Sequence, residues 1–216
     1  MRRKLRAFGK GKGFQRLRKP SECFVQDKDE YKDEDKDKVE EKNARKMKIA
    51  VLGLGESLQL FDASQFDASI GVNDIWARVP ADYVVCVDKP DRFEPERLAG
   101  VVAARCKAFY SQLGEWSFMP NFYPIELQPA YPTYICQLDP PALPKSHCSP
   151  FIAAAIACKL HNASEVHLFG VDLVNHPLLK AATCERIRIH FKNLRDAMAL
   201  RGCVLKVHGG GLLRSL

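Results

Sequence analysis

The sequence predicts an α/β protein: a Rossmann-like, mainly parallel β-sheet with helices on both faces, preceded by a disordered N-terminal tail. Three observations lead to this prediction. Charged residues are concentrated near the N-terminus, short continuous apolar runs recur along the rest of the chain, and helical segments separate several of these runs. Continuous apolar strands that alternate with helices are typical of a parallel sheet buried on both faces.

The N-terminal residues differ in composition from the rest of the chain. Residues 2–19 carry nine basic and no acidic side chains, and residues 22–41 carry ten acidic and four basic ones. Residues 48–216 hold 17 basic and 16 acidic side chains, which excludes a wholly basic nucleic-acid-coating domain. A segment this charged cannot bury enough apolar surface to offset its ordering entropy. We therefore expect a disordered tail over residues 1–46 and one Rossmann-like domain over residues 47–216.

The tail has three interpretations. Its acid-free start resembles an organelle-targeting sequence or an arm that contacts phosphate backbones. The interpretation we prefer is that Met47 is an internal start and that the preceding residues are dispensable.

The expected location is the cytoplasm. The sequence has no run of about 18 apolar residues to span a bilayer, and no apolar segment of the signal-peptide kind follows the basic start. In that location the eight cysteines are expected to be reduced thiols. They contain no C-x-x-C pair, and their spacing matches none of the usual structural zinc patterns.

Apolar runs predict six strands, and helical patterns predict three helices. The strand candidates are residues 48–53, 68–73, 83–88, 106–110, 165–170 and 203–207. The helix candidates are residues 57 to about 64, 150–161 and about 178–200. Residues 116–144 contain seven of the thirteen prolines, which predicts an irregular excursion over the carboxyl edge of the sheet.

Residues that follow the strands are the first candidates for a site, because ligands of open parallel sheets bind at this edge. Gly53 and Gly55 allow a tight turn, Ser57 is placed to cap the next helix, and the helix start then offers amides to a phosphate. An ordinary tight turn is the alternative. A dinucleotide fingerprint would need a third glycine where Leu58 stands, so an NAD-linked oxidoreductase with Asp74 as its acidic residue is the poorest fit.

Other strand ends carry the same kind of residue. Asn73 follows the second strand, Asp88 and Asp91 follow the third, and Gly170 and Asp172 follow the fifth. Two carboxylates at such a place suit a metal–phosphate complex, although they more often cap helices or face solvent. Together these residues favour a nucleotide or phosphate pocket.

Two further residues are candidates for a functional role. Ser149 stands where the alanine-rich helix begins and presents a hydroxyl there, with a plain N-cap as the alternative. His190 follows Asp172 by about one strand–loop interval, where a neutral imidazole would take a proton from an acceptor hydroxyl. His176 and His208 compete for that role, and a lone histidine is more often structural.

Five segments, taken in order, resemble one superfamily. It contains the bacterial family 42 sialyltransferases and the 6-hydroxymethylpterin diphosphokinase-like proteins. The resemblance covers roughly residues 47–210. The segments are Val51–Leu58 (VLGLGESL), Ile70–Asn73 (IGVN), Tyr83–Asp88 (YVVCVD), Ser149–Ala157 (SPFIAAAIA) and Val166–Asp172 (VHLFGVD).

The resemblance implies a modified Rossmann fold that binds an activated nucleotide. It places Asn73 and the turn of Gly53, Gly55 and Ser57 at the phosphates and sugar. Ser149 would lie on the nucleobase side. The resemblance also makes His190 similar in position to the sialyltransferase general base, while the segment ending in Asp88 looks more like the diphosphokinase-like branch.

The sequence thus predicts a nucleotide-dependent transferase. The leading form is a sialyltransferase-like glycosyltransferase that uses a nucleotide-sugar donor and an unidentified hydroxyl acceptor, with His190 and Asp172 as catalytic residues and no metal. The donor site would comprise Gly53, Gly55, Ser57, Asn73, Asp88, Ser149 and Gly170. One alternative is a pyrophosphokinase that uses ATP and magnesium held by Asp88 and Asp91. Another is a non-catalytic nucleotide- or nucleic-acid-binding module. A chain this compact suits a bacterial or phage-encoded enzyme; its oligomeric state stays open.

Overall fold

The computed structural model describes residues 47–128, 136–139, 141–174 and 179–216. The chain divides into Met1–Ala44, which lies outside these residues, and Arg45–Leu216, which contains all of them. The predictions for the tail, and His176, therefore fall outside the described residues.

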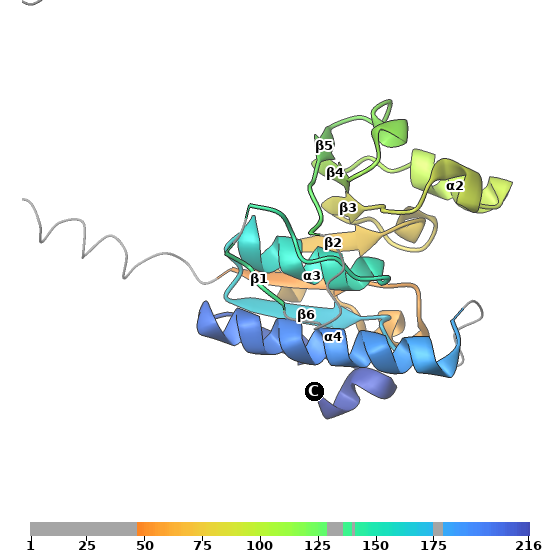
Figure 1. The fold of residues 1–216 in the computed structure, drawn as a ribbon. Coiled ribbons are helices and arrows are strands. Elements are labelled where there is room, and N and C mark those ends of the chain that lie inside the picture. Colours follow the sequence, from red (N-terminus) through yellow and green to blue (C-terminus); the bar gives the residue numbers. More distant parts are fainter. Residues whose placement is uncertain (1–46, 129–135, 140, 175–178) are drawn as a thin grey trace, which may run out of the picture. The chain divides into compact units, whose positions relative to one another are not determined.

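Seven parallel strands form one sheet in the order β5-β4-β3-β2-β1-β6-β7 (Figure 1). From β1 the chain moves in one direction through β2 to β5, and it then returns to the other side of β1 for β6. The point where the strand order reverses is therefore the carboxyl end of β1 and β6, the usual place for a ligand crevice in such sheets. The strands are β1 Lys48–Leu52, β2 Ala68–Val72, β3 Tyr83–Val85, β4 Ala108–Ser111, β5 Phe122–Pro124, β6 Glu165–Phe169 and β7 Val204–Val207.

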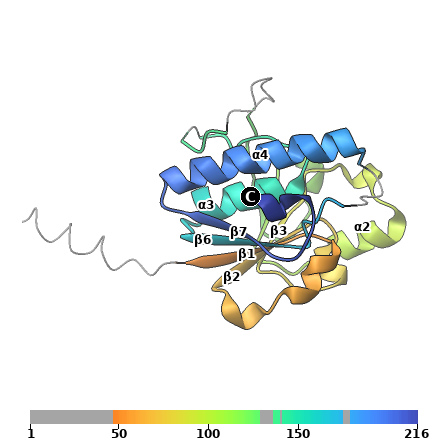
Figure 2. The same cartoon turned by 90° about the horizontal axis from the view of Figure 1, so that it is seen from below.

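Helices cover both faces of the sheet (Figure 2). On one face lie α3 (Ser149–Lys159) and α4 (Ala181–Leu200), and on the other lie α2 (Pro95–Val102) and several short 3₁₀ helices. Alternate residues of β1 face the two layers, which explains why the strand is apolar throughout. The alanines of α3 let this helix lie close to the sheet, and all of its residues from Phe151 to Cys158 are buried.

The predicted fold class is confirmed, with all seven strands parallel. Among the described elements, one strand and one α-helix were not predicted. β5 is a three-residue strand inside the excursion expected to be irregular, and α2 is a short, half-exposed helix that begins at Pro95. The helix expected from residue 57 to about 64 consists of two 3₁₀ helices, Glu56–Leu60 and Ala63–Gln65.

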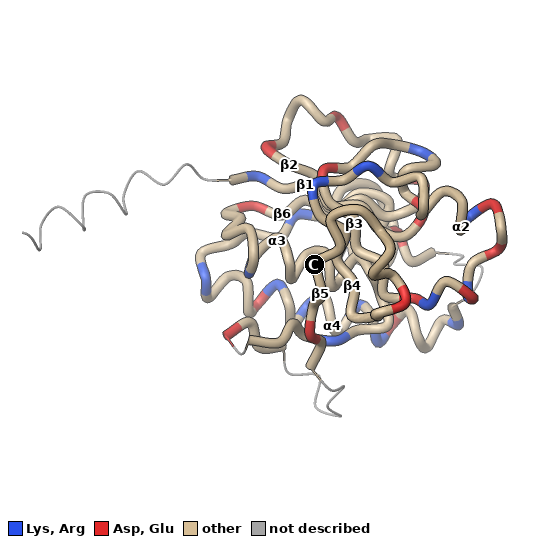
Figure 3. Tube along the Cα trace, turned by 90° about the horizontal axis from the view of Figure 1, so that it is seen from above, with Lys and Arg blue, Asp and Glu red and all other residues tan. Residues whose placement is uncertain are grey.

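Basic and acidic residues are interspersed along the described chain (Figure 3). Many pair locally, as Arg188 does with Glu185 on α4. None of the helices within the described ranges is long and apolar enough to cross a membrane.

Candidate functional site

The turns that follow β1 and β6 are in backbone contact at the carboxyl edge. The amide of Gly53 donates to the carbonyl of Phe169 (2.7 Å), and the amide of Gly55 donates to the carbonyl of Gly170 (2.9 Å). A Cβ on Gly53 would collide with the carbonyl of Gly170, and Gly170 itself adopts a positive φ of 65°. These glycines are therefore required by the close approach of the two turns.

Ser57 and Asp172 connect the same two turns. The hydroxyl of Ser57 donates to Asp172 Oδ1 (2.6 Å) and accepts from the amide of Gly170 (2.8 Å), and the Ser57 amide donates to Asp172 Oδ2 (3.1 Å). The expected capping role of Ser57 is wrong: the N-cap position is Gly55, and the carboxylate of Asp172 accepts the amide of Ser57 in the first turn of this 3₁₀ helix. Ser57 lies inside the helix because its hydroxyl bonds to Asp172 across the sheet edge.

The C-terminal segment closes over this pair. The amide of Leu212 donates to the carbonyl of Asp172 (2.9 Å). Gly209 and Gly211 have positive φ values of 88° and 94°, and a Cβ on either would collide with Ser57 or Asp172. The three consecutive glycines after the last strand are the sequence signal of this contact. Our site prediction did not include them.

Asn73 directly follows β2 in a left-handed conformation (φ 51°), and its backbone amide donates to the carbonyl of Val85 (3.0 Å). Its side-chain Oδ1 is buried and has no hydrogen-bond partner, and the same is true of Trp76 Nε1 three residues later. Within the described residues these two atoms are the only buried side-chain polar atoms left unpaired. An unpaired buried acceptor and an unpaired buried donor thus share the turn after β2.

Asp74 is held by an arginine that the sequence prediction missed. Arg97 on α2 donates from Nε to Oδ2 (3.1 Å) and from Nη2 to Oδ1 (2.7 Å), and this hydrogen bonding raises the pKa of Arg97. A bidentate pair fixes the carboxylate, so Asp74 is not placed to bind a ribose in the manner of a dinucleotide site. Asp88 and Asp91 are exposed, and the carbonyl of Asp88 accepts from Trp116 Nε1 (2.8 Å).

Ser149 is the first residue of α3 and is 8% exposed. The N-cap position belongs to Cys148, which makes no side-chain capping bond, so the alternative of a plain N-cap serine is wrong. The hydroxyl of Ser149 lies in the first turn of an 11-residue helix, where the backbone dipole favours negative charge.

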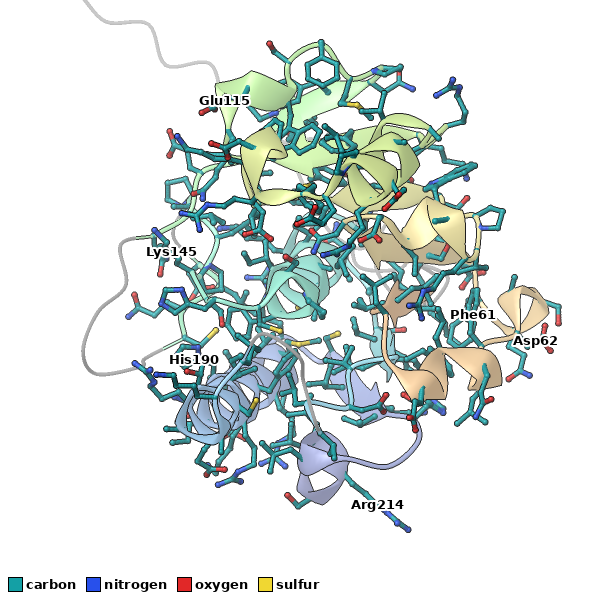
Figure 4. All side chains as sticks on the ribbon, turned by 90° about the vertical axis from the view of Figure 1, so that its right-hand side faces the viewer. Phe61, Asp62, Glu115, Lys145, His190 and Arg214 are labelled. Atoms are coloured by element: carbon teal, nitrogen blue, oxygen red, sulfur yellow. The ribbon has the colours of Figure 1, made fainter. Side chains whose placement is uncertain are left out.

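His190 lies on α4 beside the loop that leads into α3. Its Nδ1 is hydrogen-bonded to Ser146 Oγ (2.9 Å), and its ring lies 6.0 Å from that of Phe151. Figure 4 shows the molecule from the carboxyl edge of the sheet, with the labelled side chains of His190 and Lys145 in the same part of the view. Burial lowers the pKa of His190, and the nearby charges of His147 and Arg186 lower it further.

The two predicted catalytic residues therefore have different hydrogen-bonded partners: Asp172 bonds to Ser57, and His190 bonds to Ser146. His208, the competing histidine, bonds through Nε2 to Nδ1 of His167 (2.8 Å) and stacks on Phe169. The Ser57–Asp172 pair thus lies at the carboxyl ends of β1 and β6, and His190 lies on α4 beside the residues that lead into α3.

Comparisons of the chain with models of known protein families, with curated proteins and with solved structures find no match.

Proposed function

We propose that the carboxyl edge of the sheet binds a nucleotide-activated donor and that the protein transfers a group from it to an acceptor hydroxyl. The specific form we favour is a sialyltransferase-like glycosyltransferase. The observation that carries the proposal is the buried, unpaired Oδ1 of Asn73 at the end of the strand next to β1.

Leaving a buried acceptor unpaired costs about 1–3 kcal/mol. Such a cost is typical of positions that are kept for binding. A carbonyl oxygen needs a donor, so Asn73 suits a ribose hydroxyl or a nucleobase amine and not a phosphate. Trp76 Nε1, the second unpaired atom, donates and so suits a phosphate oxygen or a base carbonyl. A nucleotide carries groups of both kinds.

The chemistry proposed for the edge uses groups of this chain. His190, with its lowered pKa, is neutral at pH 7 and suited to accept the proton of the acceptor hydroxyl. Ser146 fixes the orientation of the ring through Nδ1. Negative charge that develops on the departing phosphate is stabilised by amides at the start of α3, where Ser149 adds a hydroxyl.

The alternative of an ATP-dependent pyrophosphokinase is favoured by one observation. Asp74 and Asp88 both lie near the thiol of Cys86, whose pKa is raised by burial and then by these carboxylates. Asp74 is occupied by Arg97, so a magnesium ion would depend on Asp88 together with substrate phosphates. Magnesium is commonly held in this way, by one or two carboxylates and the phosphates, so Asp88 fits such an ion. The ion would neutralise the charge of the transferred phosphoryl group.

The test is a thermal-unfolding panel on the full chain with CMP, CDP, UDP, GDP, ATP and NAD, each with and without magnesium. A ligand at about 100 times its dissociation constant adds about 2.7 kcal/mol to the free energy of unfolding. Stabilisation by a sugar-nucleotide leaving group without metal supports the proposal. Stabilisation by ATP only with magnesium supports the alternative, and no stabilisation by any nucleotide contradicts both.

A further inference from the structure

A cavity of about 280 Å³ lies at the opposite, amino edge of the sheet, away from the proposed donor site. It is lined by Cys158, Asn162, Ala163 and Arg201. Cys158 belongs to the last turn of α3, and Arg201 directly follows α4. The cavity has room for a small molecule such as hydrogen peroxide.

The cavity contains one member of a thiol pair. The side chains of Cys158 and Cys203 are hydrogen-bonded to each other, and both residues are free thiols. Cys203 comes just before β7, so the pair joins the end of α3 to the start of an edge strand. The two thiols therefore interact directly through their side chains.

The surroundings make the two thiols unequal. The hydrogen bond from Cys203 and the charge of Arg201 lower the pKa of Cys158 against the opposing effect of burial. The carbonyls at the C-terminal end of α3 also oppose a thiolate, and the guanidinium offsets them. The hydrogen bond and burial raise the pKa of Cys203, and Glu165 adds to this effect. One sulfur is therefore favoured as the thiolate and the other as the thiol.

Arg201 also forms an ion pair at the surface of the protein. It donates from Nη1 to Asp139 Oδ1 (3.1 Å), and the Asp139 side chain is 90% exposed. An ion pair of this exposure holds its partners weakly. The guanidinium therefore remains available to the cavity, where its charge favours an anionic sulfur and polarises a bound oxygen.

We propose that Cys158 is a peroxide-reactive cysteine and that Cys203 is its resolving partner. The thiolate of Cys158 attacks one oxygen of hydrogen peroxide; an S–O bond forms, the O–O bond breaks, and hydroxide leaves and is protonated to water. Cys203 then attacks the sulfenic sulfur. An S–S bond forms, the S–O bond breaks, and a second water leaves with the Cys203 proton. Two thiols are oxidised to one disulfide, and one peroxide is reduced to two waters.

The experiment treats the reduced full chain with one equivalent of hydrogen peroxide and maps every cysteine by mass spectrometry after alkylation. The expected product is about 2 Da lighter and carries a disulfide between Cys158 and Cys203. Cys203→Ser should instead accumulate a sulfenic acid on Cys158 that dimedone traps. Cys158→Ser should form neither product. Arg201→Gln should slow the reaction several-fold, because it removes the cation beside the thiolate.

Cys106→Ser is the matched control, since this buried thiol on the other side of the sheet has its pKa raised by burial. It should leave the rate and product unchanged. If a variant fails to fold, the labelling rate of each cysteine in the unaltered protein still decides the question. Oxidation of Cys106 as fast as Cys158 would overturn the proposal, as would a disulfide that joins Cys158 to Cys136.

Discussion

Ser57 and Asp172 lie 115 residues apart in sequence and are joined by two hydrogen bonds, from the hydroxyl to Oδ1 (2.6 Å) and from the amide to Oδ2 (3.1 Å). The same hydroxyl accepts from the amide of Gly170. The pair therefore fixes the turns after β1 and β6 to each other at the point where the strand order reverses. Asn73, which follows the neighbouring strand β2, keeps a buried side-chain oxygen without a hydrogen-bond partner.

Replacing Ser57 by Ala should lower the free energy of unfolding by about 1–3 kcal/mol, because the buried amide of Gly170 and Oδ1 of Asp172 both lose the hydroxyl as their partner. Urea unfolding measures the change. Ser64→Ala is the matched control: its hydroxyl also bonds to an aspartate, Asp62, but at an exposed site. The control should change stability by no more than about 0.5 kcal/mol. Equal effects of the two substitutions would show that the Ser57 contact is not structural.

Gly53→Ala should destabilise the protein by at least about 1–3 kcal/mol, because the added Cβ meets the backbone carbonyl of Gly170, which cannot move without separating the turns. Gly114→Ala is the control, since a Cβ there meets no atom within 4 Å. It should be neutral or stabilising by up to about 1 kcal/mol. Thermal unfolding of both variants against the parent decides between them. A tolerated Gly53→Ala would contradict the close approach of the two turns.

The acid sensitivity of the fold should depend on Glu165. A hydrogen bond from Lys206, and a second with His167, lower the pKa of this carboxyl to about 2. Its pKa in the unfolded chain is near 4.5, so the unfolded state binds the proton more readily. The contribution of Glu165 to stability is complete above about pH 4.5 and is lost as the pH falls toward about 2.

Urea midpoints measured between pH 6 and pH 2.5 test this dependence. Glu165→Gln should flatten the fall in stability over the acidic range. Glu126→Gln, at an exposed loop position, should keep the slope of the parent. If both variants follow the parent curve, the Lys206 and His167 contacts do not support the fold.

The parallel sheet was predictable because each of its other six strands lies within a mainly apolar run that is followed by a polar or turn-forming residue. β5 was not predicted because it ends in Pro124 and lies in a proline-rich stretch, whereas β3, which also has three residues, belongs to a longer apolar run. α2 was not predicted because it spans eight residues and buries only Val101 fully, so its sequence shows little helical periodicity of apolar residues. Short elements are specified by tertiary contacts more than by their own pattern.

The candidate site was predictable in its location but not in its bonds. The residues that end the strands gather at one edge because all the strands are parallel. The Ser57–Asp172 and Asp74–Arg97 pairs depend on side-chain directions across turns that are distant in sequence, and nothing in the local pattern specifies them. The capping role expected of Ser57 failed for the same reason, because a tertiary partner competed with the local helix.

Asn73→Gly should leave the fold intact or slightly more stable. Glycine adopts a φ of 51° without strain, and the substitution removes the buried unpaired Oδ1. Nucleotide binding should weaken by about two- to tenfold, since the loss of one hydrogen bond to a neutral group costs about 0.5–1.5 kcal/mol. Thermal unfolding with and without the stabilising nucleotide measures both quantities.

Asn162→Gly is the matched control for this backbone effect. Asn162 has the same φ of 51°, is exposed and lies at the other edge of the sheet. The control should show the same tolerance and unchanged binding. A destabilised Asn73→Gly variant would indicate that the amide serves the fold and would remove the main support for the proposed donor site.

The proposed transferase reaction should depend on the ionisation of His190. Burial lowers the pKa of His190 below its ordinary value of 6.5, so its neutral form persists into mildly acidic solution. The acid limb of kcat/KM should therefore fall below pH 6.5. His147→Gln should shift this limb to higher pH, because the charge of His147 is one of the causes that lower the pKa of His190.

His190→Gln should reduce kcat by about 10²- to 10⁴-fold, the usual contribution of a general base. If kcat is unchanged in His190→Gln, another group removes the proton. The same conclusion follows if the acid limb of the kcat/KM profile stays at the same pH in His147→Gln.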